Sequence, residues 1–167
     1  GFLPLDYIPG LIETYRQARS KRGESVTPVE LWSAIDTDHM FRIPALRYVE
    51  EQSRHNPQTY NYLFTWKSPI PYLGACHTLD VGLVFGNTRE NLYGSSPEVE
   101  KLSGNMQDAW TSFARTGDPG CVSLGTWPPY GSRRLTMILG NECRIEEAPY
   151  EEERRVWESL PAQFRGC

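Results

Sequence analysis

The chain contains 167 residues, of which 39% are hydrophobic, 12% aromatic and 23% charged. This much apolar and aromatic material supports a folded core and excludes an intrinsically disordered chain. Its 17 Lys and Arg residues against 21 Asp and Glu residues give a net charge of -4, which disfavours a nucleic-acid-binding protein. No apolar run approaches the roughly 18 residues of a membrane span, so no membrane partner is expected. We predict a single region, residues 1–167.

The first third of the chain predicts helices. Apolar residues recur at helical spacing over residues 7–18, and cations followed by Gly23 indicate where that helix ends. Thr27 and Pro28 predict the start of a second helix, with the threonine as N-cap and the proline at the first helical position. A third amphipathic helix is expected over residues 41–49.

Residues 59–66 are β-branched and aromatic, with apolar groups on both faces, and predict a strand in the middle of a covered sheet. A loop rich in proline and glycine follows. Ser96 and Gly117 delimit the clearest helix. Residues 135–139 predict a short strand with 143–145 as its hairpin partner, and a charged helix is expected at the end of the chain. Four tryptophans are expected to anchor the core: Trp32, Trp66, Trp110 and Trp157.

These elements indicate the α/β class, with few central strands packed by helices. A strand that is central by its pattern, in a chain with about three strands, predicts an incomplete sheet. The chain also begins with Gly1 rather than methionine, so we expect it to be a piece of a longer polypeptide. An open strand edge tends to pair with another copy, which predicts a homodimer through that edge.

Four cysteines, Cys76, Cys121, Cys143 and Cys167, are too few and too widely spaced for a disulfide-rich scaffold. Because no two of them form a Cys-x-x-Cys pair, a zinc ribbon or thioredoxin-type motif is excluded, and we expect no metal and no cofactor. We favour reduced thiols and a cytoplasmic location, and the formation of one or two disulfides is the alternative. Arginine greatly outnumbers lysine, which suggests a GC-rich bacterial source.

Only three histidines could act as an acid or base. His55 lies at a polar helix end, which is typical of a solvated surface residue. His39 follows Asp36 and Asp38, but carboxylates two positions apart do not share a helix face, so structural contacts are favoured over a metal site. His77 differs, because it lies in a loop of small residues after the predicted strand, where open α/β sheets place their reacting groups.

Two interpretations of His77 follow from its position: a catalytic base and a hydrogen-bonded structural histidine. In the catalytic case, one ring nitrogen faces a nucleophile and the other an orienting carboxylate. Cys76 is adjacent, but neighbouring side chains point apart, so a thiol–imidazole dyad is not expected.

The segment around His77 resembles the histidine segment of the type B carboxylesterases, the family that also holds cholinesterases and neuroligins. The resemblance rests on Gly74-Ala75-Cys76-His77-x-x-Asp80 and Val84-Phe85-Gly86. Four other segments match the family in the same order, at residues 37–44, 60–66, 110–119 and 127–130.

The resemblance implies the C-terminal part of an α/β-hydrolase fold and the hydrolysis of small carboxylic esters. It implies a triad of serine, glutamate or aspartate, and histidine, in that chain order. His77 matches the catalytic histidine, and Gly74, Ala75 and Asp80 match its supporting loop. Asp80 stands where the family commonly has glutamate.

One departure from the family is large: no Gly-x-Ser-x-Gly sequence occurs in the chain. The nucleophile and the acid are therefore expected upstream, in a missing N-terminal part of the same enzyme, and the chain alone is expected to be inactive. The alternative is a non-catalytic, cholinesterase-like interaction module that keeps the fold without the triad. The upstream sequence would discriminate between the two, because a serine at the nucleophile position favours the enzyme.

Overall fold

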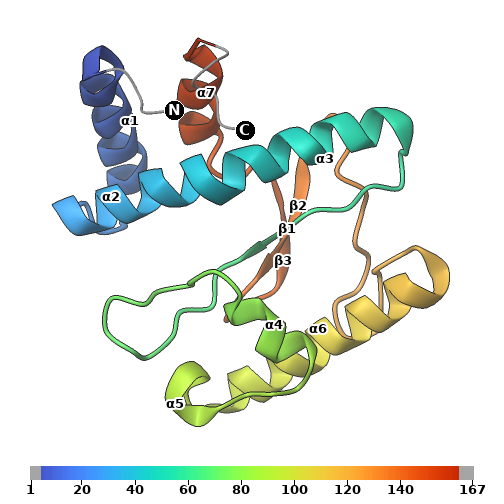
Figure 1. Ribbon diagram of the computed structural model, residues 1–167. Helices are drawn as coiled ribbons and strands as arrows, with labels where there is room; N and C mark the ends of the chain where they lie inside the picture. The colour runs from blue at the N-terminus through green and yellow to red at the C-terminus, as the bar shows by residue number, and fades with distance from the viewer. Residues whose placement is uncertain (1–4, 162–167) are drawn as a thin grey trace. The chain divides into compact units, whose positions relative to one another are not determined.

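The computed structural model describes residues 5–161, which form two compact units (Figure 1). The helical unit contains the residues up to Gln52 and those from Pro149 onward, and the sheet unit contains Ser53–Ala148. Cys167 lies outside the described residues. That residues 1–167 form one region of a larger domain stays a prediction.

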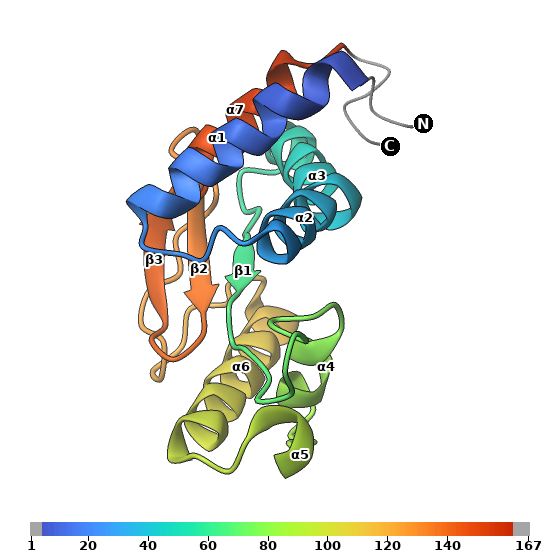
Figure 2. The same cartoon turned by 90° about the vertical axis from the view of Figure 1, so that its left-hand side faces the viewer.

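The helical unit packs its long helices around one apolar core. Its helices are η1 (Leu5–Tyr7), α1 (Ile8–Lys21), α2 (Pro28–Thr37), the π-helix η2 (Asp38–Arg42), α3 (Ile43–His55) and α7 (Glu151–Ser159). The last three residues of α3 belong to the sheet unit. Helices α1 and α7 lie side by side (Figure 2), although they come from opposite ends of the chain. The buried apolar side chains between these helices are Leu11, Tyr15, Leu31, Ile35, Ile43, Trp157 and Leu160.

The predicted start of the second helix is confirmed. Thr27 has extended backbone angles, and its Oγ1 accepts a hydrogen bond from the backbone N–H of Glu30 at 3.4 Å. Pro28 occupies the first helical position, where its missing N–H costs nothing.

The Thr27→Ala variant should therefore lose about 1 kcal/mol of unfolding free energy, because the first turn of α2 loses its side-chain acceptor. Urea unfolding of the 167-residue chain, followed by circular dichroism, measures the change. Thr27→Ser keeps the hydroxyl and serves as the control, which should retain most of the stability. Equal stability of the alanine and serine variants would contradict the capping role.

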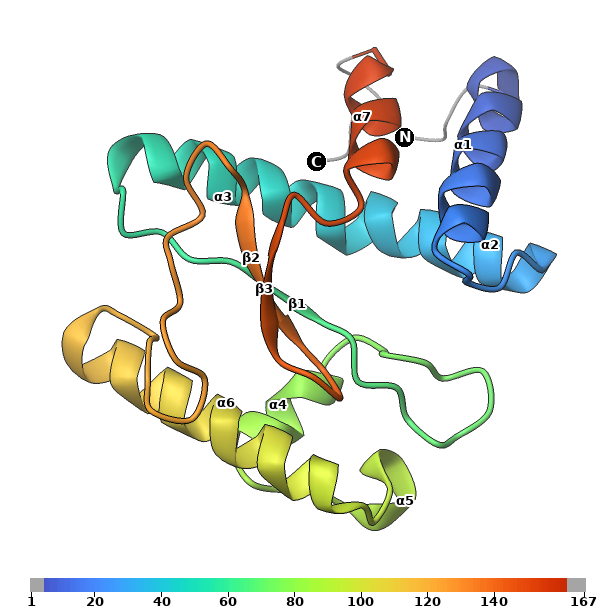
Figure 3. The ribbon, with the colours of Figure 1, turned by 180° about the vertical axis from the view of Figure 1, so that it is seen from behind.

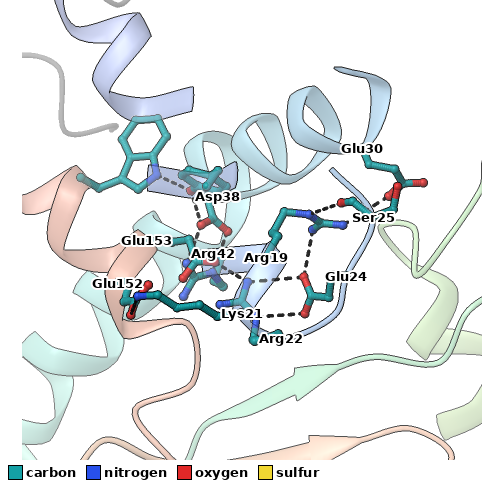
Figure 4. Close-up of polar contacts among 12 residues, drawn as sticks. Arg19, Lys21, Arg22, Glu24, Ser25, Glu30, Asp38, Arg42, Glu152 and Glu153 are labelled. Carbon is teal, nitrogen blue, oxygen red and sulfur yellow. Dashed lines mark hydrogen bonds and ion pairs between the residues drawn. The ribbon is translucent and has the colours of Figure 1, made fainter. Parts of the chain in front are cut away.

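A buried polar network joins η2 to α1 and α7 (Figure 4). Asp38 is 6% exposed and accepts a hydrogen bond from Arg42 Nε at 2.6 Å and another from Tyr15 Oη. Trp157 Nε1 donates to Tyr15 Oη at 2.6 Å, so the network reaches the last helix. Burial raises the pKa of Tyr15, and the charge and hydrogen bond of Asp38 raise it further, so this hydroxyl keeps its proton.

The sheet unit holds a small mixed sheet and three helices. Its elements are β1 (Tyr62–Phe64), α4 (Leu79–Val84), α5 (Glu90–Tyr93), α6 (Pro97–Thr116), β2 (Leu135–Leu139) and β3 (Arg144–Glu147). The strand order is β1-β2-β3, with β1 parallel to β2 and β3 antiparallel to it. The predicted hairpin of the last two strands is confirmed, with Met137 opposite Ile145.

The predicted middle strand lies at an edge of the sheet within the described residues. Strand β1 pairs with β2 on one side, and its contact with β2 continues at both ends, from Met137 N to Asn61 O at 3.0 Å and from Thr65 N to Leu139 O at 2.8 Å. Within residues 5–161 no strand pairs with the outer edge of β1, which agrees with the predicted incomplete sheet.

Helices α4 and α6 lie on the same side of the sheet (Figure 3). The apolar residues of α6 that are buried there are Val99, Leu102, Met106 and Ala109, while Trp110 is half-buried and Phe113 is 49% exposed. The tryptophan prediction is right for Trp66 and Trp157 and wrong for Trp32, which is 69% exposed. Trp32 is turned by about 100° around α2 from the buried Leu31, which places it outside the buried stripe of the helix. The sheet unit buries Trp127 as well, which the sequence did not indicate.

Candidate active site

His77 lies in the connection between β1 and α4, two residues before the helix begins (Figure 1). The chain leaves β1 and forms an exposed loop whose base is closed by a hydrogen bond from Ser68 N to Gly74 O at 2.9 Å. The side chain of His77 is exposed. His77 thus belongs to the connection that follows the parallel strand β1, and in α/β sheets such connections commonly carry reacting groups.

Two residues with left-handed backbone bracket the histidine. Gly74 has φ of +58°, and nothing lies within 4 Å of a Cβ added there. Thr78 directly follows His77 and has φ of +69°, which is unfavourable for a β-branched residue. The turn closes with a hydrogen bond from Leu79 N to Cys76 O at 3.1 Å. The backbone thus reverses sharply at His77 and enters α4.

Helix α4 is anchored to the core of the sheet unit by two buried leucines and a tyrosine hydroxyl. Leu79 and Leu83 are almost fully buried, and the hydroxyl of Tyr93 donates to the carbonyl of Leu79 at 2.8 Å. Trp66 Nε1 in turn donates to the carbonyl of Tyr93 at 3.1 Å. A Cβ added to Gly82 would lie 2.0 Å from Tyr93 Oη, so only glycine permits this close approach. These contacts hold the first turn of α4, and with it the residues that precede it.

The residues predicted to support His77 lie within three positions of it in the sequence and differ in burial. Asp80 is half-buried, and its Oδ2 accepts a hydrogen bond from Tyr62 Oη at 2.8 Å. Ala75 is exposed, whereas Cys76 is half-buried and packs against the core of the sheet unit. Since Cys76 is directed to the core and His77 to the surface, the geometry does not favour a dyad between them.

The other two histidines lie outside this connection, one packed in the helical unit and one exposed. The ring of His39 stacks on that of Trp157, with centroids 5.4 Å apart and an interplanar angle of 7°. His55 is exposed at the last position of α3.

Cys76, Cys121 and Cys143 are free thiols. Residues 5–161 contain no cluster of three or more His, Cys, Asp or Glu side chains that could hold a metal ion. Over the same residues, no helix has the length and apolar character needed to cross a membrane.

Two tyrosines of the site were missed at the sequence level. Tyr62 binds Asp80 and Tyr93 binds the Leu79 carbonyl, over separations of 18 and 14 residues. Periodicity reports local structure, so it holds no signal for such contacts.

The small mixed sheet with its packed helices is a part of an α/β-hydrolase fold, the fold of the solved carboxylesterases that the chain resembles. The family model described as "Carboxylesterase family" matches residues 6–157. The chain belongs to the carboxylesterase family.

Its relatives are carboxylic-ester hydrolases. The chain is 39% identical to the para-nitrobenzyl esterase of Bacillus subtilis over 71% of its own length and 25% of that protein. It is 34% identical to the bile salt-activated lipase of Mus musculus, over 80% of the chain and 22% of that protein. A solved carboxylesterase of Geobacillus stearothermophilus matches with a TM-score of 0.69 and 29% identity, over 94% of the chain and 32% of that structure. The chain thus spans about a quarter of the length of the two sequence relatives.

Proposed function

We propose that the chain is the C-terminal portion of a serine carboxylesterase and that His77 is the histidine of its Ser-Glu/Asp-His triad. The observation that carries the proposal is the exposed imidazole in the strained turn between β1 and α4. The chain that carries this imidazole belongs to the carboxylesterase family. The part of the Bacillus subtilis esterase that the chain matches is 25% of the length of that protein. We call the longer polypeptide that contains this chain the complete polypeptide.

In the proposed reaction, the imidazole of His77 accepts the proton of the serine hydroxyl as the serine attacks the ester carbonyl. The imidazolium then gives that proton to the leaving alcohol, and the same steps with water release the acid and regenerate the enzyme. The serine, the acid that orients the imidazole and the oxyanion donors come from the rest of the complete polypeptide. Gly74, Ala75 and Asp80 shape the loop that presents His77.

The substrate that fits this proposal is a small carboxylic ester, and the proposed location is the bacterial cytoplasm. The proposed partner is the N-terminal part of the same polypeptide. Within residues 5–161, strand β1 pairs with β2 alone, which leaves its outer edge open for another strand. In the complete polypeptide an upstream strand would fill this edge, and in the isolated chain a second copy would do so.

Hydrolysis of p-nitrophenyl acetate by the 167-residue chain and by the complete polypeptide tests the proposal. The chain alone should hydrolyse at the background rate, because a histidine without nucleophile and oxyanion donors supplies little acceleration. The complete polypeptide should be active. An inactive complete polypeptide without an upstream serine would favour the non-catalytic module, and activity of the chain alone would mean that a nucleophile lies within it.

A further inference from the structure

The hydroxyl of Tyr62 connects the strand that precedes His77 to the helix that follows it. We propose that Tyr62 is a positioning residue, which acts through Asp80 to fix the place of the His77 turn relative to the end of β1. The inference rests on the proposed function of His77 and names a residue beyond it.

The contact spans the whole connection that carries the histidine. Tyr62 opens β1, and its Oη donates to Asp80 Oδ2 in the first turn of α4 at 2.8 Å. Between them the chain runs through a loop whose Tyr72 is 95% exposed. A long exposed loop fixes the distance between its ends poorly, so a direct bond between strand and helix sets where α4 begins.

The ring of Tyr62 is itself held in place. It packs edge-on against Trp110 of α6, with centroids 5.2 Å apart and an interplanar angle of 72°. Trp110 in turn meets Trp127, which is 4% exposed, at 6.4 Å. Because packing restricts the ring, its hydroxyl lies at a defined point, and the carboxylate of Asp80 is held there.

The hydroxyl of Tyr62 can donate to Asp80 at neutral pH because its pKa is raised. Tyr62 is 37% exposed, and the partial burial of its side chain raises the pKa of the phenol, which the hydrogen bond and charge of Asp80 raise further. The phenol therefore remains protonated through neutral pH and donates to the carboxylate, which is a charge-assisted bond.

Two side chains then fix the first turn of α4 from different directions. Tyr93 holds the carbonyl of Leu79 from the core, and Tyr62 holds the carboxylate of Asp80 from the strand. His77 lies two residues before Leu79 and three before Asp80. It is part of the turn that the hydrogen bond from Leu79 N to Cys76 O closes. Since a displacement of about 1 Å can cost roughly 100-fold in rate, even a partial loosening of this turn should lower kcat.

The Tyr62→Phe variant of the complete polypeptide should show a kcat about 10-fold lower with an unchanged KM for p-nitrophenyl acetate. Phenylalanine keeps the contact with Trp110 and removes only the hydroxyl. Tyr60→Phe is the matched control, because that hydroxyl donates to the exposed side chain of Gln58 at 2.7 Å and its ring packs on Phe113. It should leave kcat unchanged.

Removing the acceptor tests whether Tyr62 acts through Asp80. Asp80→Ala should lower kcat as Tyr62→Phe does, and the double variant should be no slower than the slower single variant, because both remove one interaction. Additive losses, or a kcat for Tyr62→Phe equal to that for Tyr60→Phe, would overturn the proposal.

A second measurement needs no activity and separates this inference from the proposed function. In the 167-residue chain, Tyr62→Phe should shift the ring resonances of His77 and speed hydrogen exchange of the Leu79 amide, while Tyr60→Phe should change neither. Unchanged spectra in Tyr62→Phe would overturn the positioning role. An active His77→Ala enzyme would instead overturn the proposed function and leave this measurement valid.

Discussion

The His77→Ala variant of the complete polypeptide should hydrolyse p-nitrophenyl acetate with a kcat roughly 10⁶-fold below that of the unmodified protein. In the proposed reaction the imidazole accepts the serine proton during attack and protonates the leaving alcohol, and its removal leaves no group for either step. What remains is the contribution of substrate binding and of the oxyanion donors. Steady-state kinetics at saturating ester measures the loss, and the exposed position of His77 predicts that folding is unaffected.

His55→Ala is the control for this variant, because it removes another exposed histidine at the end of α3. It should retain the kcat of the unmodified protein. Both variants should unfold at the same urea concentration. If His77→Ala keeps its activity within about 10-fold, the base of the reaction is a different group, and the turn between β1 and α4 has a structural role.

Helix boundaries could be predicted because their chemistry is local. Thr27 and Pro28 fix the start of α2, and Gly117, with φ of +77°, ends α6 where the sequence placed the end. Ser96 is the N-cap residue of α6 as predicted, although its side chain makes no capping hydrogen bond. Backbone angles, more than the side-chain bond, set this boundary.

The connection around His77 was predicted only in part. Its small residues indicated a tight loop, and Gly74 has the positive φ that such a loop requires. Helix α4 was not predicted, because six residues are too few to show helical periodicity and a helix this short is stable only through packing. The contacts of Tyr62 and Tyr93 depend on that packing.

The buried ion pair between Asp38 and Arg42 in the helical unit could not be predicted from the sequence either. The spacing of Asp38 and Arg42 is that of one helical turn, a spacing at which exposed pairs are common and weak. Their burial follows from the way α1 and α7 pack around η2. The π-helical turn at Asp38–Arg42 has no local sequence signal either.

The Arg42→Ala variant should lose about 3–5 kcal/mol of unfolding free energy, because it leaves the buried carboxylate of Asp38 without its cation. The side chains of Asp38 and Arg42 are 8% and 12% exposed. Burial lowers the pKa of Arg42, but the hydrogen bonds and charge of Asp38 outweigh this effect and raise it overall. Arg42 is therefore charged, and Tyr15 remains as a neutral donor to Asp38 (Figure 4 shows the pair).

Urea unfolding of the 167-residue chain measures this loss, with Arg133→Ala as the control. Arg133 pairs with Glu147, but the two side chains are 68% and 53% exposed, so water replaces the pair at little cost. The Arg133→Ala variant should unfold as the unmodified chain does. A loss in Arg42→Ala no larger than that in Arg133→Ala would mean that the buried pair does not hold η2 in place.

A double variant distinguishes the cost of an unpaired charge from the value of the pair itself. Asp38→Asn with Arg42→Met removes both charges, keeps an acceptor for Tyr15 and fills most of the volume of the arginine. It should recover most of the stability lost in Arg42→Ala. The free energy gained from the attraction of two buried charges is about as large as the cost of removing them from water, so the loss of both charges together changes the stability little. If the double variant is as unstable as Arg42→Ala, the forked hydrogen bonds of Arg42 to Asp38, and not charge neutralisation, hold η2 against α1 and α7.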